Sequence, residues 1–156
     1  MKKEYKCIAD DSITREFLAC LKVMRMKAGL SQKGLADMLN IRKNDVQCYE
    51  LGRNSPSLSV LMRLAEFFKY DLSESVNYKF FHQTIKPSSL KRELKRFGLS
   101  YTEIGKLAGY DRQQIFETVN YRKYASVGCM AAILEILKHE RMSSRLREKF
   151  ERRRRE

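Results

Sequence analysis

The sequence predicts an all-α protein built from two related helical units. Apolar residues recur at three- and four-residue steps through most of the 156 residues, which is the period of helices with one buried face. No segment shows the strict alternation of a half-buried strand. A shift of 69 residues places Gly29-Leu30-Ser31 on Gly98-Leu99-Ser100. The copies then align without a gap as far as Lys69, which favours duplication over a chance match of two amphipathic stretches.

The charge favours a polyanionic partner. The chain carries 32 Lys and Arg against 19 Asp and Glu, a net charge of +13. Residues 1–78 contribute +3 and residues 79–156 contribute +10, so bulk attraction comes mainly from the second half. Nucleic acid is the first expectation and an acidic membrane surface the second. The apolar fraction, 43%, is that of an ordinary folded protein and argues against wholesale disorder.

No membrane span, secretory leader, metal site or catalytic motif is evident. Apolar runs stay short of the ~20 residues that cross a bilayer, and the first residues, MKKEYKCIADD, lack an apolar core. Four cysteines lie far apart and only two histidines are present, which argues against zinc and fits reduced cytosolic thiols. Without a phosphate loop, a nucleophile elbow or paired carboxylates, we expect a cytoplasmic non-enzyme with no cofactor.

The first expected helix spans about residues 13–28. Asp11 or Ser12 can cap its start through a side-chain oxygen, and Gly29 ends it, since glycine accepts the left-handed conformation. Its buried stripe consists of Ile13, Phe17, Leu21, Met24 and Ala28.

Three further helices complete the first unit. A short segment carries Leu35, Ala36 and Leu39 on one face, and Asn40-Ile41 forms a tight turn after it. A second short segment turns Val46 and Tyr49 inward, and residues 52–56 then break the pattern. The last helix buries Leu58, Leu61, Leu64, Ala65 and Phe68.

We expect four regions along the chain: a first unit at 1–70, a linker at 71–87, a second unit at 88–140 and a basic tail at 141–156. The linker contains a weaker helix from Leu72 to Phe81, capped by Asp71 or Ser73. Phe80, Phe81 and His82 pack it against one domain. The tail is a basic helix with Leu146 and Phe150 on one side, and it frays into four arginines.

Two short helices joined by a turn suit DNA recognition, because a helix fits the major groove of B-DNA while its neighbour braces it. The helix around residues 43–51 buries Val46 and Tyr49 and leaves polar side chains outside. Asn and Gln can pair with adenine, and Lys or Arg with guanine. An ordinary solvated face is the plainer alternative. The polar side chains on this outer face and its flanks are Arg42, Lys43, Asn44, Gln47 and Cys48.

The run from Leu21 to Phe68 resembles the Cro and phage-repressor (XRE-type) helix-turn-helix family, over about a third of the chain. Turn, cap and stripe positions agree together. The matching residues are Met24-Arg25, Gly29-Leu30-Ser31-Gln32, Leu35-Ala36, Leu39-Asn40-Ile41, Val46, Tyr49-Glu50, Gly52, Ser55-Pro56-Ser57, Leu61 and Leu64-Ala65.

The resemblance implies a domain of about five helices whose third helix reads DNA. By position, Lys43, Asn44, Gln47 and Cys48 face base edges. Gln32 starts the second helix beside a phosphate and braces the reader, while Arg53 and Asn54 contact the DNA backbone. Two residues depart from the family pattern. Arg42 replaces the usual small cap, and Gly34 replaces an acidic residue.

The second copy keeps the framework, with four to five helices expected. Ser100 and Glu103 form a capping box, Asp111 caps the next helix, and Ile104 and Ile115 keep the buried positions. Its third helix is expected to end differently, because Gly52 and Pro56 are replaced by Tyr121 and Ala125. Its candidate DNA contacts are Arg112, Gln113 and Gln114, with Arg122 at the position of Arg53, and Phe116 and Glu117 are also expected to face outward.

These features predict a sequence-specific regulator that binds double-stranded DNA, most often a repressor in a bacterium or phage. It binds as a monomer with tandem readers, or as a homodimer whose readers lie about 34 Å apart. The alternative is an antitoxin-like or phage anti-defence protein whose second domain holds a protein partner or dimerises. An apolar surface around Phe116 and Tyr121 favours that partner, and an open basic face favours DNA. An RNA-binding module is weaker, because no aromatic sheet is indicated.

Overall fold

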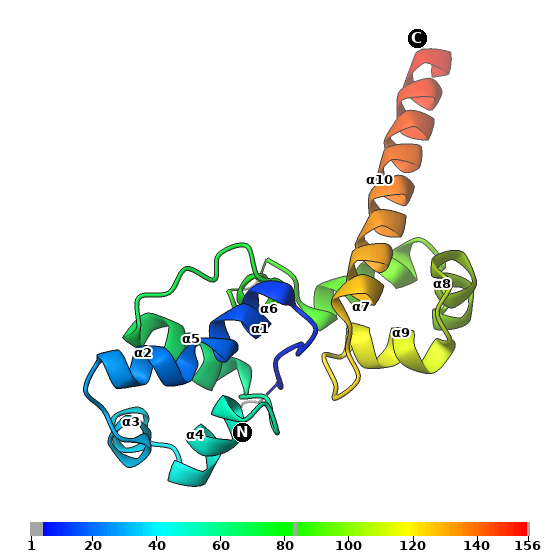
Figure 1. The fold of residues 1–156 in the computed structure, drawn as a ribbon. Helices are drawn as coiled ribbons and strands as arrows, with labels where there is room; N and C mark the ends of the chain where they lie inside the picture. Colours follow the sequence, from blue (N-terminus) through cyan, green and yellow to red (C-terminus); the bar gives the residue numbers. More distant parts are fainter. Residues whose placement is uncertain (1–4, 83, 156) are drawn as a thin grey trace. The chain divides into compact units, whose positions relative to one another are not determined.

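The computed structural model describes residues 5–82 and 84–155, and these residues form helices and no strand. Their single β-type pairing is an isolated antiparallel bridge between Lys6 and Ser57. This confirms the all-α prediction. The helices fall into two compact units (Figure 1), and residues 121–123 belong with the first. The predicted region limits at residues 1 and 156, and residue 83 in the linker, lie outside the described residues.

The first unit contains six of the helices. The first helix predicted over residues 13–28 is divided at Cys20, whose φ is −90° and ψ −5°. Asp11 caps it as predicted, accepting from the Ile13 N–H at 3.2 Å. The bend turns Arg25 into the core and leaves Ala28 exposed. The helices are α1 (Ser12–Ala19), α2 (Leu21–Lys27), α3 (Gln32–Leu39), α4 (Lys43–Glu50), α5 (Leu58–Phe67) and α6 (Val76–Phe81).

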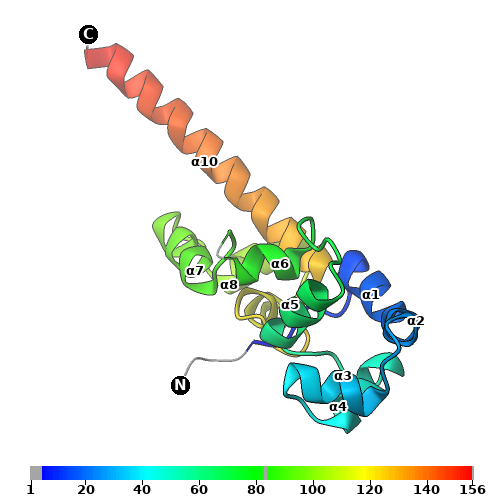
Figure 2. The same cartoon turned by 90° about the vertical axis from the view of Figure 1, so that its left-hand side faces the viewer.

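The core around α3, α4 and α5 follows the predicted pattern. α3 and α4 lie side by side in both views (Figure 2). Ser31 and Ser57 cap α3 and α5, and Asn40 makes the turn in the left-handed conformation with φ 53°. Phe68 is half-buried, just past the end of α5. The predicted stripe residues that are buried are Leu35, Ala36, Leu39, Val46, Tyr49, Leu58, Leu61, Leu64 and Ala65.

The helix predicted from Leu72 starts later, at Val76, and its cap is Ser75 instead of Asp71 or Ser73. The Asp71 carboxylate instead accepts from the Ser73 N–H in the preceding turn. α6 packs against α5, and buried Asn77 bonds both backbone groups of Ile8, at 2.6 and 3.0 Å. The segment therefore completes the first unit's core, and residues up to 86 group with that unit.

The second unit contains α7 (Pro87–Arg96), α8 (Tyr101–Ala108), α9 (Arg112–Val119) and α10 (Val127–Arg155). The Ser100–Glu103 capping box and the Asp111 cap are both present as predicted. α8, α9 and α10 begin 69 residues after α3, α4 and α5, and α8 and α9 also end 69 residues after α3 and α4. The sequence offset of the repeat is thus also the offset of the helix bounds.

α9 does not end differently from α4, so that expectation was wrong. It stops at Val119, and Tyr121 takes a φ of 51° where Gly52 takes 67°. This left-handed conformation costs energy in a tyrosine. Packing compensates, because the Tyr121 ring is 2% exposed and stacks on Phe80 with ring centroids 3.7 Å apart. Its hydroxyl donates to the Val76 carbonyl at 3.3 Å.

The basic tail is the end of α10, which continues as helix to Arg155 instead of fraying at its arginines. This part extends beyond α7, α8 and α9 in both views (Figure 1, Figure 2). Leu146 and Phe150 are exposed on one side, together with Met142. In the described part of the chain, none of the helices is both long and apolar enough to cross a bilayer.

Candidate nucleic-acid interface

The outer face of α4 is polar and free of internal partners. Lys43, Asn44 and Gln47 are exposed, and their side chains make no hydrogen bond or ion pair with the described residues. They lie three and four positions apart, so they share one face of the helix. Cys48 is half-buried at the edge of this face. The buried Val46 and Tyr49 fix the opposite face against the core.

The start of α4 is organised by Asp45, which compensates for the missing cap. Arg42 has no acceptor in its side chain and cannot cap a helix. The Asp45 carboxylate instead accepts from the Arg42 backbone N–H at 3.4 Å and from its guanidinium at 3.0 and 3.1 Å. These hydrogen bonds lower the pKa of Asp45, and the carboxylate also suits the positive end of the helix dipole. Arg42 itself stays 83% exposed beside the outer face.

The other end of α4 is braced by a buried ion pair that the sequence motif contains but whose role we did not predict. Glu50 accepts from Arg25 Nε at 2.5 Å and from Gln32 Nε2 at 2.9 Å. The side chains of Arg25 and Glu50 are 10% and 3% exposed. Burial raises the pKa of Glu50, but the hydrogen bonds from Arg25 and Gln32 outweigh it and lower the pKa. Arg25 also donates to the Leu30 carbonyl at 2.7 Å, so α2, α3 and α4 are tied together.

Gln32 therefore lies at the start of α3 as expected, with its amide directed to Glu50. The signal for this brace was a charged residue, Arg25, four positions after buried Leu21 on an apolar helix face. The phosphate contact of Gln32 stays a prediction.

The loop after α4 presents the two predicted backbone contacts. Arg53 and Asn54 are exposed, and the Asn54 side chain accepts from the Ser55 N–H at 3.0 Å, which shapes the turn. The N-terminal segment runs against this loop, where the Leu58 N–H donates to the Tyr5 carbonyl at 2.8 Å. It brings Lys6 into an open groove shared with Arg42 and Asn54. No periodic pattern marks Lys6, and sequence analysis missed it.

The predicted residues of the second copy do not form one polar face. Arg112 and Gln113 are exposed, and Gln113 donates to Glu117 at 2.9 Å on the same helix. Gln114 does not point outward as predicted, because its amide is half-buried and donates to the Tyr124 carbonyl at 2.6 Å. Arg122 is exposed but belongs to the first unit, apart from the residues of α9.

Phe116 and Tyr121 do not form the apolar surface that a protein partner would need. Tyr121 is buried in the first unit. Phe116 is half-buried, with its ring 6.0 Å from that of Tyr101 and not facing outward as predicted. Neither side chain offers an exposed aromatic face.

Residues 21–75, about a third of the chain, match the family model described as Helix-turn-helix, of the Cro/C1 type. The match begins with α2 and ends at the cap of α6. Comparison with curated proteins and with solved structures found no match. The matched segment is of a DNA-binding regulatory type, which indicates a transcription regulator that binds double-stranded DNA.

Proposed function

We propose that this protein is a transcription repressor that recognises a specific DNA sequence by placing α4 in the major groove. The observation that carries the proposal is the outer face of α4. Lys43, Asn44 and Gln47 stand on it without internal partners, inside the segment that matches the helix-turn-helix model. Unpaired amides and cations are the groups that read base edges.

The proposed roles follow from these positions. Lys43, Asn44, Gln47 and Cys48 face the bases. Arg42, Gln32, Arg53 and Asn54 contact the backbone around them, and the start of α3 adds a partial positive charge for a phosphate. The brace on Glu50 fixes the angle of α4, because a reading helix must be held rigidly to discriminate bases.

Repression follows if the bound protein covers a promoter and excludes polymerase. The protein then acts in the cytoplasm of a bacterial cell, on a bacterial or phage operator. A homodimer on a palindrome would place two copies of α4 about 34 Å apart.

Selection of bound duplexes from a random pool tests the proposal on the full chain. We expect one enriched sequence for the native protein and a loss of enrichment for the double variant Asn44→Ala/Gln47→Ala. Glu66→Ala, an exposed change on α5, is the matched control and should keep the native preference. If the native chain enriches nothing, α4 does not read DNA. A reporter gene behind the selected sequence then separates repression from activation.

The second unit is proposed as a diverged copy of the first, supported by the shared 69-residue offset of its helix bounds. Its α9 carries Glu117 and half-buried Phe116 on the face equivalent to the reader, which does not favour a second base-reading helix. The exposed Met142, Leu146 and Phe150 of α10 favour an alternative, in which this unit dimerises or binds a protein as in an antitoxin-like regulator. Light scattering of the native chain and of Leu146→Glu distinguishes self-association from a monomer.

A further inference from the structure

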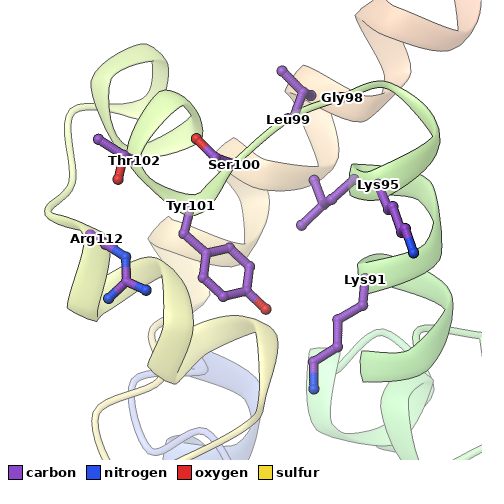
Figure 3. A pocket seen from close by; sticks show the side chains of 9 residues that line it. Lys91, Lys95, Gly98, Leu99, Ser100, Tyr101, Thr102 and Arg112 are labelled. Carbon is purple, nitrogen blue, oxygen red and sulfur yellow. The ribbon is translucent and has the colours of Figure 1, made fainter.

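A basic groove in the second unit lies away from the outer face of α9 (Figure 3). α7 supplies Lys91 and Lys95, which face Tyr101 of α8 and Arg112 of α9. The groove has a volume of about 530 Å³. Its remaining lining residues are Leu94, Gly98, Leu99, Ser100 and Thr102.

The three cations of the groove have no partner in the described part of the chain. Lys91, Lys95 and Arg112 make no ion pair or hydrogen bond there, and no carboxylate lines the groove. Lys91 and Lys95 are four residues apart on one helix, where like charges repel. The nearest acidic residues in sequence are committed elsewhere, because Glu103 and Asp111 accept from backbone N–H groups at the starts of α8 and α9. An uncompensated positive cluster of this kind is suited to an anion.

The backbone adds donors at the same place. The first N–H groups of a helix have no partner within it. The Ser100–Glu103 box satisfies two N–H groups of the first turn of α8, and those of Tyr101 and Thr102 have none in the described residues. Both residues line the groove.

The apolar part of the lining decides which anion fits. A hydrated inorganic ion needs no apolar wall, and one water occupies only about 30 Å³. Here Leu99 and the Tyr101 ring stand half-exposed beside the cations. A sugar attached to a phosphate covers such a wall with its carbon atoms while the phosphate meets the lysines.

We propose that this groove binds the sugar-phosphate backbone of the DNA on which the protein acts, so that the second unit contributes sequence-independent affinity through α7 and α8. The inference rests on the proposed function and assigns a role to the unit whose α9 lacks a free reading face. Lys91, Lys95 and Arg112 hold the phosphates, and the first turn of α8 donates to them.

The test measures duplex binding by the full-length protein against salt concentration. Lys91→Ala/Lys95→Ala is compared with Lys106→Ala/Lys138→Ala, which removes two exposed lysines of the same unit outside the groove. We expect the groove variant to lower the slope of log K against log salt by about two. Its affinity at about 0.15 M salt should fall about 30-fold, equally for selected and random duplexes. The control should keep most of the native slope.

Three other outcomes are informative. Equal slopes for the two double variants overturn the groove and leave the role of α4 intact. If the native protein binds no duplex, the proposed function fails as well. If inorganic pyrophosphate raises the melting temperature of the native protein but not of the groove variant, while DNA slopes stay equal, the occupant is a small phosphate compound and the backbone proposal is overturned.

Discussion

At the scale of single residues, the exposed side chains of α4 divide into those with internal partners and those without. Arg42 is engaged by Asp45, whereas Lys43, Asn44 and Gln47 are free. Free amides lose nothing inside the protein when they bind a base, so their removal affects recognition and leaves folding unchanged.

Asn44→Ala and Gln47→Ala should each reduce discrimination between the selected duplex and a random one by about 1–3 kcal/mol. Both side chains are exposed, so the free energy of unfolding should stay within about 0.5 kcal/mol of the native value. Competition binding and urea denaturation measure the two quantities. Native discrimination in both variants would remove these residues from the reader.

Arg53→Ala should weaken binding to every duplex and lower the salt slope by about one, because a backbone contact releases one counterion. The residue is exposed in the loop after α4, so the fold is unaffected. Binding isotherms at several salt concentrations measure the slope. A change confined to the selected sequence would show that Arg53 contacts a base.

At the scale of elements, the brace on Glu50 is the largest local commitment of the first unit. Removing one partner of a buried ion pair leaves the other charge uncompensated, which typically costs about 3–5 kcal/mol. The pair joins α2 to α4, and Gln32 adds α3. Sequence analysis found these residues in the motif, but only the packed helices show that they meet.

Glu50→Gln should therefore destabilise the protein near neutral pH, and the difference should shrink in acid. The folded pKa of Glu50 is lowered relative to about 4.3 in the unfolded chain, so its contribution is complete above that value. The contribution is lost as the pH falls through the lower, folded pKa. Urea denaturation of both proteins between pH 7 and pH 3 measures the difference, and a constant gap would contradict the role of the carboxylate.

The packing of α8 against the turn before α9 depends on Gly105. A Cβ atom at this position would lie 2.5 Å from the Tyr110 carbonyl oxygen, which is backbone and cannot turn aside. Gly105→Ala should cost about 1–3 kcal/mol through overpacking. Gly34→Ala is the control, since its new Cβ meets only side-chain atoms, the nearest being Ser31 Oγ at 3.2 Å. Thermal melts compare them, and equal stability would contradict the close approach.

At the scale of the whole molecule, discrimination and bulk affinity are assigned to different units. The reader lies in the first unit, and residues 79–156 hold +10 of the net +13. Asn44→Ala and Lys91→Ala belong to different units and share no partner. Their effects on the free energy of DNA binding should add within about 0.5 kcal/mol. A larger coupling, measured by a double-mutant cycle, would show that the two sites do not act independently.

The sequence by itself determined the helical class, the 69-residue offset, the capping residues Ser100 and Asp111, and the buried stripes of α3, α4 and α5. These features depend on the helical period and on hydrogen bonds between residues close in the chain, so a pattern of residue types carries them.

Tertiary structure alone decided the bend at Cys20, the place of α6 in the first unit, the partners of Gln114 and the brace on Glu50. Each of these joins segments that are distant in sequence or depends on how helices turn against one another. Asn77 meets Ile8 across 69 residues, and Arg25 meets Glu50 across 25. The left-handed Tyr121 is held by Phe80, and no rule of local conformation places a tyrosine there.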